Sequence, residues 1–286
     1  MAQDALLYGA SLIRPGASMR DVLDKVEAYI RAQGCAPAFP AQSCVNHIAA
    51  HYCPTDREDY IYQAHDLVKL DVGVHADGHI GDNALTLSLD GTHEDLIAAT
   101  KAALADAERL LKPGVTPHII GAAIERAITE RGFQPVRNLT GHGLQQWVQH
   151  APPSIPNYPA GDHTPLEPGM VIAIEPFATD GSAGMITTTS DPTLFSLGSV
   201  RPVRTPHARA VLQAIEKYNG LPFTTRWLTQ ELGARAALGI AELRRAGILE
   251  EYAPLPERSK GLVAQHEHTF LITEDGFERL TSPTKK

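Results

Sequence analysis

Two aspartates, Asp71 and Asp82, lie in the stretch "KLDVGVHADGHIGDNALTL" (69–87). Alternating apolar and polar residues on either side of the ADG sequence at 76–78 predict a β-hairpin. With the turn centred on the first two of these residues, we expect the aspartates to face each other directly across the strands. Like charges in that arrangement destabilise a sheet. A shared proton, the cationic side chain of Lys69 or a divalent cation would offset the repulsion, and a solvated face would reduce it.

Three further residues of metal-ligand type occur in unexpected contexts. Glu175 ends the apolar run "VIAIE", where burying an unpaired carboxylate costs on the order of several kcal/mol. Glycines flank His142 in "TGHG" and allow close backbone approach, and Glu267 lies in the strand-like "QHEHTFLI". Alone, each is better explained as a salt-bridge partner or a structural histidine. Together with the aspartates they supply oxygen ligands and one imidazole, enough for two adjacent cations bridged by carboxylates.

Two other patterns are weaker. "HIAAH" (47–51) has the histidine spacing of a helical zinc pair, but Ile48 stands where such a metalloprotease needs its glutamate base. The three cysteines form no C-x-x-C pair, so we expect buried, reduced thiols.

Helices and strands must position these residues. Helical spacing over 22–30 predicts a helix with Ser18 as N-cap and Gly34 as stop, and Thr92 is expected to cap the next helix. The apolar run before Glu175 predicts a strand buried on both faces. From about 205 to 253 the pattern is helical with few strand signals, and we interpret this block as an insertion and packing module. The sequence "GLVAQHEHTFLITEDGFERLT" then predicts a hairpin that rejoins the main sheet.

Composition limits the function classes. A chain of 286 residues with 43% hydrophobic residues can bury a substantial core. A formal charge of -8 gives no bulk reason to expect nucleic-acid or anionic-membrane binding. There is no apolar run of about 18 residues and no signal-peptide pattern, so we expect a cytoplasmic protein without a membrane span.

The five candidate ligands occur within motifs that, in this order, resemble those of a known family. The motifs are "NHIAAHY", "KLDVGVHADGHIGDNALT", "LTGHGLQQWVQH", "VIAIEPFAT" and "VAQHEHT". They are similar to the methionine aminopeptidases of the pita-bread metallopeptidase superfamily, in the type II, archaeal-like branch, over nearly the whole chain. The resemblance implies an α+β fold with a curved antiparallel sheet, covering helices and a winged-helix-like insertion. It places the catalytic domain at 1–200 and 254–286 and the insertion at 201–253.

The resemblance also implies roles for individual residues. Two divalent ions (Co, Mn, Fe or Zn) would be bound, with Asp82 and Glu267 bridging them, and Glu175 would also accept and relay the proton of the attacking water. His150 and His51 would stabilise the oxyanion and position the scissile amide nitrogen. The implied metal ligands are Asp71, Asp82, His142, Glu175 and Glu267, and the implied substrate-binding residues are Phe39, His51, Gln149 and His150.

Three positions depart from the family pattern. Asn83 follows the second aspartate and His266 precedes Glu267, where either could alter hydrogen bonds around the ligands. Gln149 replaces an aliphatic residue at the methionine pocket, which reduces apolar contact and relaxes the expected specificity.

The implied activity is that of a methionyl aminopeptidase, a metal-dependent hydrolase that removes the initiator methionine from nascent polypeptides. The expected chain is a monomer with the ribosome as a candidate partner, and it binds neither membrane nor nucleic acid directly. One alternative is a proline-directed, prolidase-like peptidase, although such relatives usually carry a domain before the first aspartate for which 70 residues leave no room. A second is a non-catalytic RNA- or ribosome-binding relative, which the complete ligand set disfavours.

Overall fold

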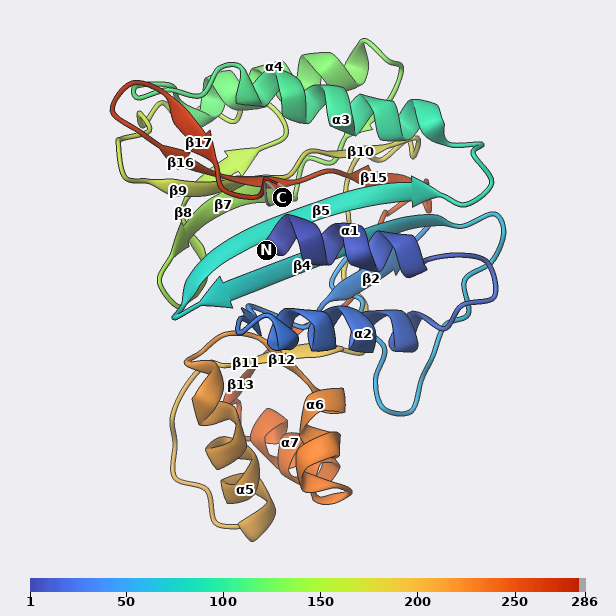
Figure 1. Cartoon of the computed structure of the whole chain (residues 1–286), viewed down its shortest axis with the longest axis vertical. Coiled ribbons are helices and arrows are strands. Elements are labelled where there is room, and N and C mark those ends of the chain that lie inside the picture. The colour runs from blue at the N-terminus through green and yellow to red at the C-terminus, as the bar shows by residue number, and fades with distance from the viewer. Residues whose placement is uncertain (283–286) are drawn as a thin grey trace.

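Helices α1 (Ala2–Leu12) and α2 (Met19–Ala32) cover one face of the first sheet in the computed structural model, which describes residues 1–282. That sheet contains β1 (Ala36–Pro37), β2 (Gln42–Val45), β4 (Leu67–Ala76) and β5 (His79–Ser88), as Figure 1 shows. As predicted, Ser18 caps α2, where its side chain accepts a hydrogen bond from the Asp21 backbone N–H. The apolar face of α2 is buried with β4 in one hydrophobic cluster.

The hairpin β4–β5 forms, but its predicted register is wrong by two positions. Ala76 pairs with His79, so Asp77 and Gly78 are the central turn residues. Both have positive φ, +48° and +83°, which a two-residue type I′ turn requires and which Asp-Gly supplies. Asp71 therefore pairs with Ala84, and Asp82 pairs with Gly73. The two aspartates are diagonal neighbours on one face instead of direct partners.

The second half of the chain forms a five-stranded antiparallel sheet covered by two helices. Helices α3 (Glu94–Glu108) and α4 (Pro117–Thr129) lie over its apolar face (Figure 1) and share a cluster with it. The prediction that Thr92 caps α3 is wrong. His93 occupies the N-cap position, and the Thr92 hydroxyl donates to Asp90. In sheet order the strands are β17 (Phe277–Arg279), β16 (His268–Ile272), β9 (Val171–Ile174), β7 (Thr140–Gln145) and β8 (Val148–Pro156).

Short strands connect the two halves. β10 (Phe177–Thr179) lies between β15 (Val263–Gln265) and β6 (Gln134–Pro135), and β3 (Ile48–Ala50) pairs with β14 (Leu255–Pro256). The apolar run before Glu175 forms the predicted strand, β9, which ends at Ile174, and a second strand, β10, begins two residues after Glu175, so Glu175 lies in the break between them. His47 and His51 flank β3 and do not lie on a helix, so "HIAAH" lacks the geometry of a helical zinc pair.

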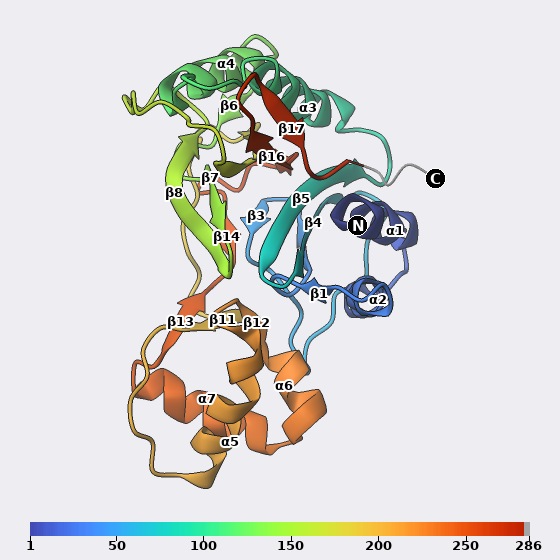
Figure 2. The same ribbon diagram turned by 60° about the vertical axis from the view of Figure 1, so that its left-hand side comes forward.

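The segment from β11 (Leu194–Leu197) to β13 (Leu249–Tyr252) is here called the helical block. It has its own apolar cluster and forms the lower part of the molecule in Figure 2. Its helices are α5 (Pro206–Ile215), α6 (Thr225–Leu232) and α7 (Arg235–Arg245), with a 3₁₀ turn, η1 (Glu216–Tyr218). The expectation of few strands is wrong here, because β11 pairs with both β12 (Phe223–Thr224) and β13. Gly247, with φ +62°, ends the last helical turn, and "LEEY" continues as a strand.

Antiparallel sheets with covering helices confirm the predicted α+β class. Within residues 1–282, no helix combines the length and apolar character needed to cross a bilayer.

Candidate metal centre

The five predicted ligands come from five separate segments that meet where the two sheets join. Asp71 lies on β4, Asp82 on β5 and His142 on β7, while Glu175 follows β9 and Glu267 lies between β15 and β16. The join itself is hydrogen-bonded: Ala84 and Glu267 exchange backbone bonds of 3.4 and 3.0 Å, and Thr269 Oγ1 contacts both the N–H and the carbonyl of Asp82 at 2.8 Å. The backbone thus fixes the positions of two acidic residues on facing segments.

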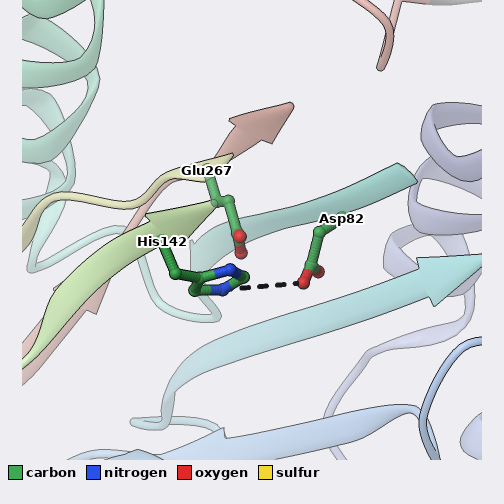
Figure 3. Close-up of side chains that lie close together, drawn as sticks. All are labelled: Asp82, His142 and Glu267. Carbon is green, nitrogen blue, oxygen red and sulfur yellow. Dashed lines mark ion pairs between the residues drawn. The ribbon is translucent and has the colours of Figure 1, made fainter. Parts of the chain in front are cut away.

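Asp82, His142 and Glu267 form a compact, buried group (Figure 3) in which one ligand atom from each lies within 4.8 Å of the others. His142 Nε2 is 4.0 Å from Asp82 Oδ2 and 3.6 Å from Glu175 Oε1. His142 Nδ1 lies 3.2 Å from the Gly143 carbonyl oxygen, which can only accept. Nδ1 therefore carries the hydrogen, and the Nε2 lone pair is directed at the carboxylates.

Burial shifts the proton affinities of these groups in the direction that neutralises them. It is the main cause that raises the pKa of Asp82 to about 7, against a hydrogen bond from Gln149 that lowers it. Burial and then neighbouring carboxylate charges raise the pKa of Asp71, Glu175 and Glu267 well above their usual range. Burial also lowers the pKa of His142 to about 3, so its imidazole is neutral near pH 7.

No lysine or arginine among the described residues forms an ion pair with these carboxylates. The Lys69 ammonium, which could have offset Asp71, instead donates to the carbonyl oxygens of Asn46 (2.9 Å) and Val263 (2.7 Å). Within residues 1–282, the buried oxygens Asp71 Oδ1 and Asp82 Oδ1 lack a hydrogen-bond partner. Burial also removes the alternative of a solvated face. Carboxylate oxygens without protein donors, beside a neutral imidazole, fit divalent cations.

A cavity of about 500 Å³ opens onto this centre. His51 and His150 line it beside the acidic residues, and the His150 ring packs edge-on against His142 with centroids 4.6 Å apart. All five predicted ligands line the cavity: Asp71, Asp82, His142, Glu175 and Glu267. The structure therefore brings the predicted ligands and both histidines to one site.

Phe39 lines a small adjoining pocket. It is 1% exposed and shares that pocket with Gln149, His51 and His150, the other residues predicted to bind substrate. The opposite wall comes from the helical block, through Leu194, Pro222 and Tyr252. The pocket is thus assembled from both parts of the chain.

The side chains of Asn83 and His266, which differ from the family pattern, point away from the metal centre. The Asn83 amide donates to the Val72 carbonyl at 2.6 Å, and the His266 ring lies 2.8 Å from the Thr100 hydroxyl under α3. Strand alternation explains both placements, since each is adjacent to a ligand and faces the other side.

Several residues at the site are not among those predicted from the sequence patterns. Gln265 Nε2 donates to Glu175 Oε2 at 3.2 Å and to Glu267 Oε2 at 3.5 Å, which holds two acidic side chains together. Its position two residues before Glu267 is the signal that could have identified it, because such residues share a strand face. Nothing in the sequence pattern indicated that Leu194, Pro222 and Tyr252 reach the pocket.

Comparison with known proteins gives matches over nearly the whole chain. The model of metallopeptidase family M24 matches residues 1–274. The methionine aminopeptidase of Archaeoglobus fulgidus is 44% identical over 281 residues, covering 98% of this chain and 94% of the relative. That of Thermococcus onnurineus is 42% identical over 269 residues, covering 93% and 91%.

Solved structures support the pita-bread fold. Methionine aminopeptidase from Thermotoga maritima aligns with a TM-score of 0.72 at 23% identity, covering 99% of this chain and 92% of that one. A thermophilic Arx1 aligns with a TM-score of 0.86 at 17% identity, covering 99% and 88%. The predicted fold is confirmed, and with it the predicted superfamily: the chain belongs to metallopeptidase family M24.

Proposed function

We propose that this chain is a methionine aminopeptidase that removes the N-terminal methionine from polypeptides. The observation that carries the proposal is a set of four carboxylates and one neutral imidazole, without a cationic partner in the described chain, on the wall of an open cavity. Asp82, His142 and Glu267 are buried, and Asp71 and Glu175 are half-buried. The strong similarity to methionine aminopeptidases along nearly the full length supports the same activity.

The proposed ligands of two divalent ions are Asp71, Asp82, His142, Glu175 and Glu267, which would hold the ions through four carboxylates and one imidazole. Ions bound there would polarise the scissile carbonyl and make a water acidic enough to attack it near neutral pH. The number of ions and their identity among Co, Mn, Fe and Zn are part of the proposal.

Protein groups then act on the substrate from fixed positions. Glu175, at the break between β9 and β10, accepts the proton of the attacking water and passes it on. Burial and the charge of His150 lower the pKa of His51 to about 4, so His51 is neutral, and its hydrogen bond to the Ala253 backbone uses the one N–H that it carries. The other ring nitrogen of His51 accepts from the scissile amide N–H, while His150 stabilises the developing oxyanion.

The pocket beside these histidines would hold the side chain of the first substrate residue. Phe39 and Leu194 supply apolar walls, and Gln149 makes one side polar. The free α-amine of the substrate would bind at the metal centre, which restricts cleavage to a single residue from the N-terminus.

The test is cleavage of Met-Ala-Ser by purified protein supplied with Co, Mn, Fe or Zn, beside an Asp82→Ala variant. Release of methionine by the native chain, and its loss in the variant, is the expected result. Intact peptide in both samples with every metal would reject the proposal. Cleavage of Xaa-Pro dipeptides instead would favour a prolidase-like enzyme, and fewer than one metal bound per chain after reconstitution would favour a non-catalytic binder.

Cellular context is proposed on the resemblance. The chain would act in the cytoplasm, as a monomer, on nascent polypeptides emerging from the ribosome. Sedimentation velocity should then give a mass near 30.9 kDa. We also propose 201–253 as the type II insertion, although the pairing of β11 with β13 suggests that the cooperative unit begins nearer to Leu194.

A further inference from the structure

His51 has a backbone conformation that a residue with a side chain rarely adopts. Its φ is +64°, in the left-handed region, and it is one of six non-glycine residues of the described chain with positive φ. Such a conformation costs free energy and persists only where surrounding groups fix it. It occurs here in one of the two histidines that line the cavity without belonging to the proposed ligand set.

Two buried side chains hold both backbone polar groups of His51. The His51 N–H donates to Gln42 Oε1 at 2.7 Å, and Thr193 Oγ1 donates to the His51 carbonyl oxygen at 2.7 Å. Gln42 and Thr193 are each 5% exposed. The strained residue is therefore fixed from both sides.

The two supports come from different parts of the molecule. Gln42 lies on β2 and pairs in register with Asp71, so it is anchored to the strand that carries one proposed ligand. The Thr193 hydroxyl also accepts from the Cys53 N–H at 3.3 Å, and the Thr193 N–H donates to the Tyr252 carbonyl at 3.2 Å.

The helical block also contacts the His51 side chain. The Tyr252 ring packs edge-on against the imidazole, with centroids 5.8 Å apart and planes at 84°. The backbone of His51 is thus held by Thr193, which directly precedes the helical block, and its ring is held by Tyr252 at the end of that block.

We propose that Gln42 and Thr193 are positioning residues that hold His51 in its left-handed backbone conformation and so direct its imidazole at the substrate. The proposal deepens the proposed function and rests on it. Thr193 acts only through the His51 backbone, whereas Gln42 also lines the cavity, so the test is centred on Thr193.

The central variant is Thr193→Val, which keeps the side-chain shape and removes the donor. With Met-Ala-Ser as substrate we expect kcat to fall about tenfold with little change in KM, since a poorly placed imidazole weakens the transition state and not ground-state binding. Thr193→Ser, which retains the hydroxyl, should restore most of kcat. Thr189→Val is the matched control, because it removes a hydroxyl bond to the Pro254 carbonyl in the same segment without touching His51.

A double-mutant cycle separates positioning from general damage. In a His51→Ala background, Thr193→Val should cause no further loss of kcat, because the group it positions is gone. An equal loss in both backgrounds, or no loss from Thr193→Val in the native background, overturns the proposal. If Thr193→Val does not fold, Gln42→Met removes the other support, with Gln42→Glu as the variant that keeps an acceptor.

A spectroscopic measurement keeps this proposal distinct from the proposed activity. In zinc-loaded protein labelled with ¹⁵N-histidine, Thr193→Val should shift the His51 backbone amide signal, and Thr189→Val should leave it unchanged. Unchanged His51 signals in Thr193→Val would overturn the positioning role. A native enzyme that does not cleave Met-Ala-Ser would instead reject the proposed function, while the shift would still report on the backbone supports.

Discussion

At the scale of single residues, burial has opposite effects on the acids and the imidazole of the metal centre. It raises the pKa of the carboxyl groups and lowers that of His142, so in both cases the neutral form is favoured. Without metal, protons compensate for carboxylate charges that cations would otherwise neutralise. Metal binding must therefore release protons, and metal affinity should increase with pH.

This gives a prediction for the stability of the metal-free protein. A carboxyl group whose pKa is raised by folding is protonated more readily in the folded than in the unfolded chain, so bound protons stabilise the fold. The contribution of these carboxyl groups to stability should be largest below pH about 4, the ordinary carboxyl value, and should be lost as the pH rises through about 7, the value for Asp82. Buried histidines with lowered pKa values, such as His142 and His51, contribute with the opposite sign below pH about 6.5. Urea unfolding of chelator-treated protein between pH 4 and 8 measures this.

Metal-loaded protein and an Asp82→Asn variant provide the comparison. Both should show a smaller loss of stability over that pH range, because one carboxyl group is either bound to a cation or absent. The difference in stability between the metal-free native protein and Asp82→Asn cancels the contribution of the buried histidines. A difference that does not change between pH 4 and 8 would contradict the proposed cause of the raised pKa of Asp82.

Gln149 gives a prediction for specificity. Gln149→Leu should lower KM for Met-Ala-Ser and increase selectivity against Gln-Ala-Ser by roughly threefold to tenfold, since added apolar contact in a small pocket is worth about 1 kcal/mol or more. The ratio of kcat/KM for the two peptides is the measurement, because it cancels any common effect of losing the hydrogen bond to Asp82. Gln146→Leu, at the exposed contact with the Asp77 carbonyl, should leave the ratio unchanged. A ratio that stays constant in Gln149→Leu would exclude Gln149 as a specificity residue.

At the scale of secondary structure elements, the glycines beside His142 allow β7 to approach its neighbours. A Cβ atom on Gly141 would lie 2.3 Å from the Ala173 carbonyl oxygen on β9, a backbone atom that cannot move aside. Gly141→Ala should therefore separate β7 from β9, displace His142 and destabilise the fold by about 1–3 kcal/mol. The denaturant concentration at the midpoint of unfolding and the number of metal ions bound per chain should both decrease. Gly276→Ala, with no atom within 4 Å of the added Cβ, should change stability by less than about 0.5 kcal/mol.

Several elements could be predicted from sequence because their signals are local. The hairpin and the helix that Ser18 caps follow from periodicity and capping residues. The predicted register of the hairpin is wrong because the two possible turn centres place every side chain on the same face, so the apolar pattern cannot distinguish them. The positive φ values of Asp77 and Gly78 decide between the two. The pattern of "GILEEY" continues that of the preceding helix and so predicts helix. These residues instead form the strand β13, because they pair with the distant β11.

At the scale of the whole molecule, a buried ion pair joins the helical block to the catalytic sheets. Arg226 on α6 and Glu27 on α2 are 2% and 1% exposed, and Arg226 Nη2 lies 3.0 Å from Glu27 Oε1. Glu27 also accepts from Trp227 Nε1 at 2.6 Å and from the Ala41 N–H at 3.2 Å. Glu27 therefore connects the block to the segment beside Phe39.

Arg226→Met should destabilise the protein by about 3–5 kcal/mol, because it leaves the buried Glu27 with only the longer ion pair to the exposed Arg31, at 3.8 Å. The double variant Glu27→Gln/Arg226→Met should be more stable than Arg226→Met alone, since the poorly compensated charge is also removed. Equilibrium urea unfolding measures both. Lys217→Met, in the exposed pair with Glu231, is the control and should cost less than about 1 kcal/mol. Equal effects of the buried and exposed substitutions would contradict the assigned role of Arg226.

The candidate site divides in the same way between what sequence could and could not predict. Its ligands have unusual residue types for buried strands, so their chemistry is visible in the sequence. The pocket walls Leu194, Pro222 and Tyr252 are ordinary side chains whose role depends on how the helical block docks, and docking depends on long-range contacts such as Arg226–Glu27. Gln42 and Thr193 escape notice for the same reason, because their importance comes from the backbone angle of His51.

The positions of the proposed ligands along the chain determine when the site can form during synthesis of the protein. Asp71 and Asp82 are synthesised early, whereas Glu267 is added nearly two hundred positions later and completes the group with Asp82 and His142. A growing chain lacking Glu267 holds an incomplete set of ligands, so the full metal complement can be captured only after the β15–β16 segment has left the ribosome and entered the sheet. A peptidase built in this way remains inactive throughout most of its own translation, and its hydrolytic activity begins only when its long-range topology is complete.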